Sequence, residues 1–209
     1  MNKVIFLDAG HGGIDPSGNY TTAPSKMFDH KTGTFHDGSI FYEGVKNREY
    51  CKLIRKACSL VGITVIPVYH PYKDTSLSAR VDIANEYHKN ICEGIYVSEH
   101  SNAANTEAKG FSVWTSIGQT KSDLYADILL DIYKNSFKGY DAVRIREQEY
   151  NDGDGDYEEN FKVLRETSMP AILTENLFFD NFSDATLLMS ETYKMKYVSA
   201  LVDWFKIIV

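Results

Sequence analysis

The sequence is poor in cysteine and has no long hydrophobic run. Its three cysteines, Cys51, Cys58 and Cys92, are an odd number without the spacing of a zinc site, which argues against both a disulfide framework and a thiolate metal site. The first apolar run, residues 4–7, ends at Asp8, whereas a secretory signal needs roughly 7 to 15 apolar residues and a membrane helix roughly 20. We therefore expect no signal peptide and a cytoplasmic location on synthesis.

Basic residues are outnumbered. There are 22 Lys and Arg against 29 Asp and Glu, which gives a formal net charge of −7 and a pI near 5.4. A surface of that sign repels phosphate backbones and anionic lipid, so we expect no nucleic acid and no membrane as a partner. A hydrophobic share of 43% indicates a globular core. The length predicts a single domain over residues 1–209.

Short apolar runs bounded by turn residues alternate with stretches of helical period. This alternation is typical of parallel strands joined by crossover helices. It predicts strands at 4–7, 64–68, 94–98, 110–114 and 171–174, and helices at 45–60, 76–87, 122–137 and 193–207. The expected fold class is α/β, a three-layer fold with a mostly parallel, twisted sheet and helices on both faces.

Two segments interrupt this alternation. Residues 14–42 are rich in Gly, Ser, Thr, Asp and His and form a long loop insertion, and ordered connections of such length usually carry function. Residues 151–159 are acidic and resemble the start of a calcium loop, but Tyr157 replaces the expected glycine and Val163 the bidentate glutamate. A solvated acidic loop is the favoured interpretation of the second segment.

Four residues that can perform chemistry stand near predicted strand ends. His11, His100 and Glu175 follow or end predicted strands, and Glu43 lies where the long loop returns to the first helix. Ligands of parallel α/β sheets gather at the carboxyl ends of the strands. Two imidazoles and one carboxylate are a ligand set of catalytic zinc, and a further carboxylate would serve as general base. Taken singly, each residue has an ordinary structural explanation. The prediction of metal-assisted hydrolysis therefore depends on all four residues lying together in the fold.

Several short motifs occur in one order along the chain. They are DAGHGG at 8–13, EGVKN at 43–47, SLSAR at 76–80, SEHSNA at 98–103, VLR at 163–165, TSMP at 167–170 and LTE at 173–175. Together they resemble the zinc-dependent N-acetylmuramoyl-L-alanine amidases of the type 3 family, which cut the bond between muramic acid and the peptide stem. The resemblance covers nearly the whole chain.

The resemblance implies that His11, Glu43 and His100 hold Zn²⁺ and that Glu175 is the catalytic carboxylate. Glu49 is the rival for the second ligand. The family pattern has a Glu, an Asn four residues later and then a helix that ends at a glycine, and Asn47 makes this pattern fit Glu43.

Further residues match the family pattern less specifically. Asn102 and Arg165 occupy motif positions that imply support of the site or contact with substrate. Arg80 could have a functional role at its motif position, or it could be a structural helix residue with a buried salt bridge. The structural interpretation is preferred. Glu99 replaces an aliphatic residue of the family pattern, and because it precedes His100 on a strand it points to the other face and is expected to be a polar neighbour rather than a ligand.

The resemblance implies hydrolysis of the amide between N-acetylmuramic acid and L-alanine, with peptidoglycan as the partner. The setting would be wall lysis or remodelling. The expected lack of a signal peptide suggests a phage or prophage endolysin that reaches the wall through another agent such as a holin. The 14–42 loop is then a substrate-selecting lip or simply a surface hairpin. Two alternatives remain open: a catalytically silent peptidoglycan-binding or assembly module, and a zinc peptidase that cuts bonds within the peptide stem.

Overall fold

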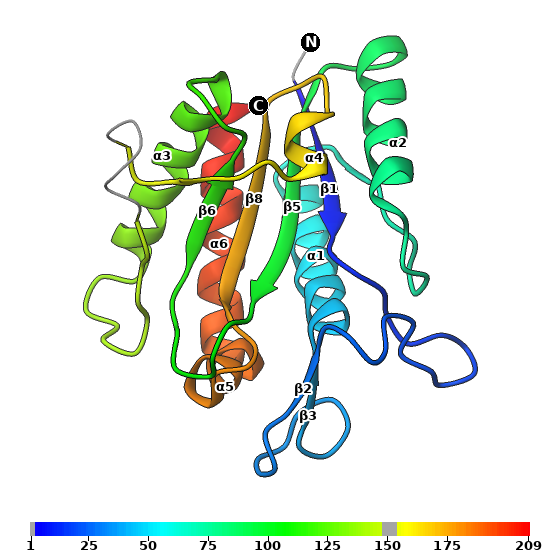
Figure 1. Cartoon of the computed structure of the whole chain (residues 1–209). Coiled ribbons are helices and arrows are strands. Elements are labelled where there is room, and N and C mark those ends of the chain that lie inside the picture. Colours follow the sequence, from blue (N-terminus) through cyan, green and yellow to red (C-terminus); the bar gives the residue numbers. More distant parts are fainter. Residues whose placement is uncertain (1–2, 148–153) are drawn as a thin grey trace.

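The computed structural model describes residues 3–147 and 154–209, and a six-stranded sheet forms its centre (Figure 1). The strand order is β4-β1-β5-β8-β6-β7, and neighbouring strands are parallel except β6 and β8, which are antiparallel. The strands are β1 (Val4–Ala9), β4 (Val65–Pro67), β5 (Gly94–Asn102), β6 (Ser112–Thr115), β7 (Tyr157–Glu158) and β8 (Ala171–Phe178). The predicted α/β class with a mostly parallel sheet is confirmed.

Six helices accompany the sheet in the described part of the chain. They are α1 (Glu43–Leu60), α2 (Leu77–Asn90), α3 (Lys121–Ser136), α4 (Lys162–Arg165), α5 (Phe182–Met189) and α6 (Glu191–Ile208). Side chains of α1, α3 and α6 join one hydrophobic cluster with the sheet, whereas those of α2 and α4 join a second. Successive strand residues point to opposite faces, so Leu7 belongs to the first cluster and Phe6 to the second. This alternation produces the predicted three layers.

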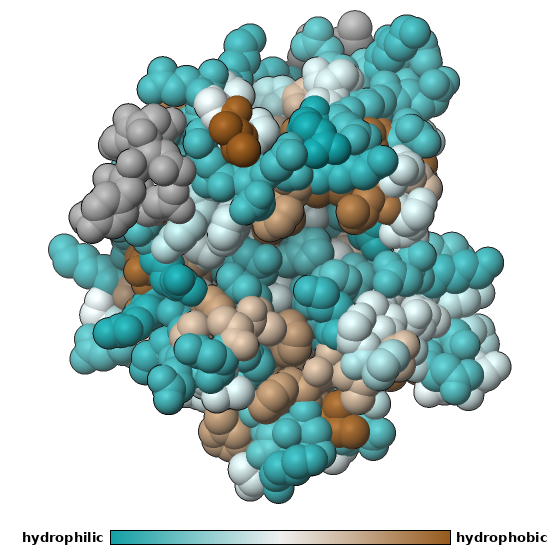
Figure 2. All heavy atoms as spheres, in the orientation of Figure 1, coloured by the Kyte–Doolittle hydropathy of each residue, from teal (hydrophilic) through white to brown (hydrophobic). Residues whose placement is uncertain are grey.

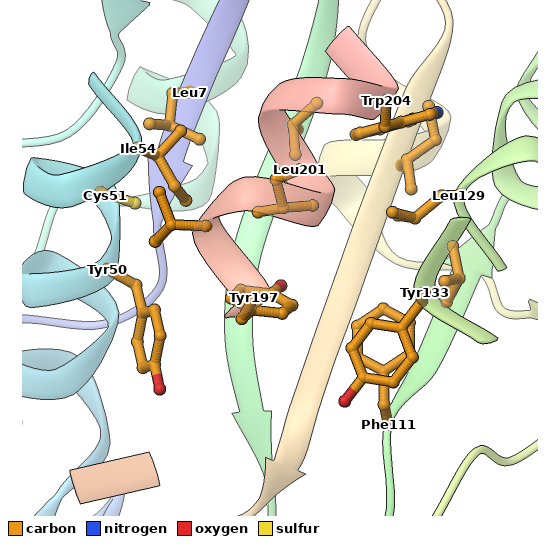
Figure 3. Close-up of a cluster of buried hydrophobic side chains, with 14 of the residues drawn as sticks. Leu7, Tyr50, Cys51, Ile54, Phe111, Leu129, Tyr133, Tyr197, Leu201 and Trp204 are labelled. Atoms are coloured by element: carbon orange, nitrogen blue, oxygen red, sulfur yellow. The ribbon is translucent and has the colours of Figure 1, made fainter. Parts of the chain in front are cut away.

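The larger hydrophobic cluster explains why the predicted helices form where they do. Tyr197, Leu201 and Trp204 recur at helical spacing on α6 and are all fully buried. Figure 3 shows them between α1, which contributes Ile54, and α3, which contributes Leu129. A stripe of this kind requires a helix, because only a period near 3.6 residues keeps these side chains on one side.

The structure corrects three details of the predicted fold. The predicted strand at 110–114 exists as β6, but it runs antiparallel to β8. Helix α5 is not predicted, because its eight residues are too few for a clear periodic pattern; its N-terminus is capped by Asn181, which accepts hydrogen bonds from two backbone amides of the first turn. Of the acidic segment, residues 151–153 lie outside the described residues, and Asp156 is 2% exposed, which contradicts a fully solvated loop.

The long 14–42 segment contains a second, two-stranded sheet. Strand β2 (Met27–Asp29) pairs with β3 (Ile40–Tyr42), and β3 leads directly into α1. His30 and Phe35 of this hairpin contact Phe182 of α5. Figure 2 shows hydrophobic surface in this lower part of the molecule, where Figure 1 places α5 and the hairpin. The hairpin is therefore packed onto the fold beside the strand ends. Among the described residues no helix has the length and apolar character needed to cross a membrane.

Candidate functional site

The structure brings three of the predicted residues into one cluster and places the fourth beside it. His11 follows β1, Glu43 is the first residue of α1 and His100 lies near the end of β5. Their ligand atoms all lie within 4.8 Å of one another, and this is the only such group found among the described residues. Glu175 lies on β8, where it is paired in register with His100, so both side chains face the same side of the sheet.

The backbone around His11 is shaped so that the two imidazoles can approach. A Cβ atom on Gly10 would lie 2.2 Å from the His100 ring, and one on Gly44 would lie 2.0 Å from the carbonyl oxygen of Gly12. Neither position admits a side chain. His11 itself adopts a φ of 63°, a conformation that costs a residue with a side chain free energy and is found at functional sites. Gly10 of the DAGHGG motif therefore permits the close approach of the His100 ring.

Glu43 stands between the two histidines. Its Oε1 atom lies 3.1 Å from His100 Nδ1 and 3.2 Å from His11 Nε2. Glu43 is 1% exposed, whereas the histidine side chains are 16% and 19% exposed, so the carboxylate forms the floor of the cluster. Burial alone would raise the pKa of Glu43, but the hydrogen bond with His100 and the contact with His11 hold this pKa below its usual range. The carboxylate is thus kept ionised.

Two atoms of the cluster are buried without a hydrogen-bond partner. These are Nε2 of His11 and Oε2 of Glu43. An unsatisfied buried polar atom costs free energy, and both atom types are ligands that zinc accepts. The residues present therefore fit a divalent cation, which would satisfy both atoms.

Neighbouring side chains hold the cluster in place. Asn47 donates from Nδ2 to Glu43 Oε1 at 3.3 Å, one helical turn along α1. Arg48 and Arg80 donate to the carbonyl oxygen of His11 at 2.7 and 3.0 Å. Arg80 also forms a buried ion pair with Asp8, which agrees with its preferred structural role. Arg48 was not predicted, because its function depends on carbonyl groups that only the folded loop brings to it.

Glu175 differs from Glu43 in its surroundings. Burial, together with the charge of Glu43, raises the pKa of Glu175 well above its ordinary value, and Lys26 opposes this shift. Its Oε2 atom is buried and has no hydrogen-bond partner. The surroundings of this carboxyl group therefore favour its neutral form, in contrast to the ionised Glu43.

The rival second ligand lies elsewhere. Both carboxylate oxygens of Glu49 are engaged at 2.5 Å by lysines, Lys46 and Lys194. Glu49 is absent from the cluster with His11 and His100. The structure thus brings Glu43, and not Glu49, to the two histidines.

Glu99 points away from the cluster, as its strand position predicts. It is fully buried and accepts hydrogen bonds from Thr174 at 2.8 Å, Tyr197 at 2.9 Å and Asn176 at 3.3 Å. Burial raises the pKa of Glu99 to about 8, so the carboxyl group favours its neutral form at neutral pH. Glu99 is a polar member of the core on the α6 side of the sheet.

The two residues expected to support the site have different positions. Asn102 ends β5 at the same edge as His100, and its Oδ1 accepts from the amide of Ala103 at 2.8 Å. Arg165 is not brought to the cluster. It donates to Asn160 Oδ1 at 2.8 Å and lines a cavity of about 500 Å³ at the opposite end of the sheet, because it precedes β8, whereas the cluster lies toward the carboxyl ends of the strands.

Sequence reasoning missed Lys26, whose ammonium group lies close to the cluster. Lys26 Nζ lies 4.0 Å from Glu43 Oε2. The residue stands 17 positions before Glu43 within the long loop, and no motif includes it. Only the length of the loop signalled that it could carry a functional residue.

Fold and cluster together define an α/β protein with a candidate metal site at the carboxyl edge of its sheet. A family model described as N-acetylmuramoyl-L-alanine amidase matches residues 5–204. The chain therefore belongs to the N-acetylmuramoyl-L-alanine amidase family.

Individual relatives are distant in sequence. The endolysin of Bacillus phage SPP1 is 26% identical over 195 residues, which cover 92% of this chain and 61% of that protein. The N-acetylmuramoyl-L-alanine amidase CwlM of Bacillus licheniformis is 27% identical over 189 residues, which cover 90% of this chain and 62% of that protein. The chain thus spans about three fifths of the length of these two relatives.

Solved structures share the fold. The N-acetylmuramoyl-L-alanine amidase from Clostridium difficile 630 superimposes with a TM-score of 0.72 at 26% identity, covering 97% of this chain and 94% of that one. The N-acetylmuramyl-L-alanine amidase Ami1 from Mycobacterium smegmatis superimposes with a TM-score of 0.73 at 20% identity, covering 100% of this chain and 98% of that one. The second comparison bears on the fold alone.

Proposed function

We propose that residues 1–209 form a catalytic domain that hydrolyses the amide bond between N-acetylmuramic acid and L-alanine in peptidoglycan. The observation that carries the proposal is the meeting of His11, Glu43 and His100, with Glu175 beside them, at one edge of the sheet in a chain of the amidase family. The names of the relatives support wall lysis or remodelling as the setting.

The proposed metal ligands are His11, Glu43 and His100, and the proposed metal is Zn²⁺. Neutral imidazole nitrogen and carboxylate oxygen suit zinc, and three protein ligands are typical of catalytic sites. The unpartnered atoms of His11 and Glu43 support this assignment. When bound, zinc supplies Lewis acidity, which lowers the pKa of a bound water to about 7 and polarises a carbonyl group.

Glu175 is proposed as the proton carrier. In its ionised form it takes a proton from the attacking water, and in its neutral form it gives a proton to the departing alanine amine. The opposing effects of burial and Lys26 on its pKa support a group that visits both forms. Glu43, in contrast, is held in its ionised form. A permanently ionised carboxylate suits a metal ligand, whereas a general base must also take up a proton.

The proposal is tested by digesting purified peptidoglycan with the zinc-loaded protein and analysing the products by mass. We expect free stem peptides that begin with alanine, together with uncut glycan strands. Peptide fragments cut within the stem would instead establish a peptidase. Absence of any product, with zinc bound and the fold intact, would establish a silent wall-binding module.

A further inference from the structure

The β2–β3 hairpin delivers one residue of the long loop to the edge of the candidate site. Its register pairs Met27 with Tyr42, and the ladder continues by one step, because the amide of Glu43 donates to the carbonyl oxygen of Lys26 at 3.0 Å. Lys26 therefore lies directly beside the first residue of α1. The 14–42 segment thus places one of its residues, Lys26, at the edge of the candidate site.

The backbone of Lys26 is held from two sides. Its carbonyl oxygen accepts a second hydrogen bond, from the hydroxyl of Tyr20 at 3.1 Å, and that hydroxyl also accepts from the amide of Gly44 at 3.0 Å. Lys26 adopts a φ of 58°, which is unfavourable for a residue with a side chain. Because the backbone of Lys26 is strained and held by hydrogen bonds, the direction in which its side chain extends from the loop is fixed.

The Lys26 ammonium group is available to a ligand. The side chain is 46% exposed, and its nearest ionic partner among the described residues is Glu43 Oε2 at 4.0 Å, which is beyond hydrogen-bond distance. The two nearby guanidinium groups are engaged: Arg48 by backbone carbonyl oxygens and Arg80 by Asp8 and carbonyl oxygens. In contrast to these two arginines, Lys26 still has donors to offer.

The charge of the surroundings indicates what this ammonium group would bind. The chain carries a net charge of −7, and the cluster itself holds Glu43 with Glu175 beside it. The two carboxylates offset most of the charge of the proposed zinc, so an anionic group farther along the substrate gains little attraction from the cluster and needs a cation of its own. A peptide that leaves from the scissile amide carries carboxylates, and a chain extends only about 3.3–3.6 Å per residue, so a carboxylate on its first or second residue lies within reach of Lys26.

We propose that Lys26 is a specificity residue that binds a carboxylate on one of the first two residues of the peptide stem. The inference rests on the proposed amidase function and adds that the enzyme distinguishes a free carboxylate from its carboxamide at this position. The ammonium group carries a positive charge and three hydrogen-bond donors, so it pairs with a carboxylate, which is negative and only accepts. A carboxamide has no negative charge, and its NH₂ group carries two donors that cannot pair with an ammonium.

The test uses two soluble substrates that differ in one group. Both are N-acetylmuramoyl-L-alanyl peptides, and the α-carboxyl group of the second residue is free in one and amidated in the other. We expect the unmodified zinc-loaded protein to show a kcat/KM about tenfold higher for the free carboxylate, in line with one charged hydrogen bond. In Lys26→Met the ratio of the two kcat/KM values falls to about one, whereas Lys26→Arg retains most of it.

A matched control comes from the same loop. Lys31 also has a positive φ, of 62°, but its ammonium pairs with Asp29 at 2.6 Å, so Lys31→Met should keep the tenfold ratio. If the positive φ makes Lys26→Met fold poorly, Lys26→Gly removes the side chain and relieves the strain. A purely structural role of Lys26 would lower both kcat/KM values together and leave their ratio unchanged.

Direct binding provides a second measurement. In the Glu175→Gln background, calorimetry with the two substrates should give the free carboxylate the lower Kd, and Lys26→Met should remove the difference. A ratio of one in the unmodified protein, or a ratio that survives in Lys26→Met, overturns the role of Lys26 alone. Failure to release peptide from either substrate or from peptidoglycan overturns the proposed function, and the inference with it.

Discussion

His100 and Glu175 lie directly opposite each other on the adjacent parallel strands β5 and β8. The two residues are 75 positions apart in the chain, yet the register fixes both side chains on the same side of the sheet. Because Glu43 contacts His100 on one side and raises the pKa of Glu175 on the other, the candidate ligand and the candidate base are electrostatically connected. Four predictions follow from this arrangement and the packing that supports it.

Replacing the candidate base should stop turnover without releasing the metal. Glu175→Gln is expected to lower kcat on peptidoglycan at least about 100-fold, because general acid–base catalysis contributes factors of that order. Zinc content, measured by atomic emission, should stay at the level of the unmodified protein. Glu107→Gln changes an exposed carboxylate on the loop after β5 and should leave both quantities unaltered; near-normal kcat in Glu175→Gln would refute its role.

Removing a histidine of the cluster should, in contrast, release the metal. His11→Ala deletes one of three proposed ligands, so its zinc content after dialysis should fall to less than about a tenth of one ion per chain. His88→Ala is the matched control, because His88 lies on α2 and accepts only from the amide of Gly94. Undiminished zinc in His11→Ala would show that the metal is held elsewhere.

The buried ion pair between Asp8 and Arg80 should be important for stability. Asp8→Ala removes the buried partner of the Arg80 guanidinium, which is 1% exposed, and leaves it only the longer, partly exposed ion pair with Asp74 at 3.4 Å. Loss of a buried partner costs about 3–5 kcal/mol of unfolding free energy, and Asp74 should keep the cost near the lower figure. Urea unfolding followed by circular dichroism measures the loss. In the exposed pair of Lys206 with Asp203, Asp203→Ala should shift the midpoint only slightly; equal losses at both sites would contradict the assignment.

The hairpin should weaken as pH falls. Burial, assisted by the charge of Lys46, lowers the pKa of His36 to about 4 from 6.5, and its Nδ1 accepts from the amide of Tyr42. The fold therefore favours the neutral ring. The associated stability is fully present above pH 6.5 and is lost as pH falls toward 4.

The expected loss is no more than about 3 kcal/mol, since one pKa unit corresponds to about 1.4 kcal/mol. Unfolding free energies of the unmodified protein and His36→Gln, measured between pH 7 and pH 4, should converge as the pH falls. Parallel pH dependences in the two proteins would show that His36 does not contribute to the change.

The sequence predicts five of the six strands described in the central sheet, because each is an apolar run bounded by turn residues, and it misses β7, which has only two residues. The stripe of Tyr197, Leu201 and Trp204 predicts α6, and the apolar run at 4–7 predicts β1. The short element α5 and the direction of β6 are not predicted. Eight residues show no decisive period, and strand direction depends on how the chain returns to the sheet.

The candidate ligands were predicted for a similar reason. His11, His100 and Glu175 stand at or near the ends of recognisable strands, and parallel strands end at a common edge. Glu43 required the motif spacing as well, since Glu49 occupies the same helix. Arg165 shows the limit of motif matching: it precedes the predicted strand 171–174 and therefore lies at the amino end of β8, away from the cluster, although its motif implied support of the site.

The sequence by itself thus determined the fold class and the residue types of the candidate site, because hydrophobic period and residue chemistry are local properties. Only the tertiary structure decided which residues meet. Strand register set Glu175 opposite His100, lysines engaged Glu49, and the hairpin closed a separation of 17 residues to set Lys26 beside Glu43. Such encounters depend on pairing between distant segments, which the local pattern of residues does not specify.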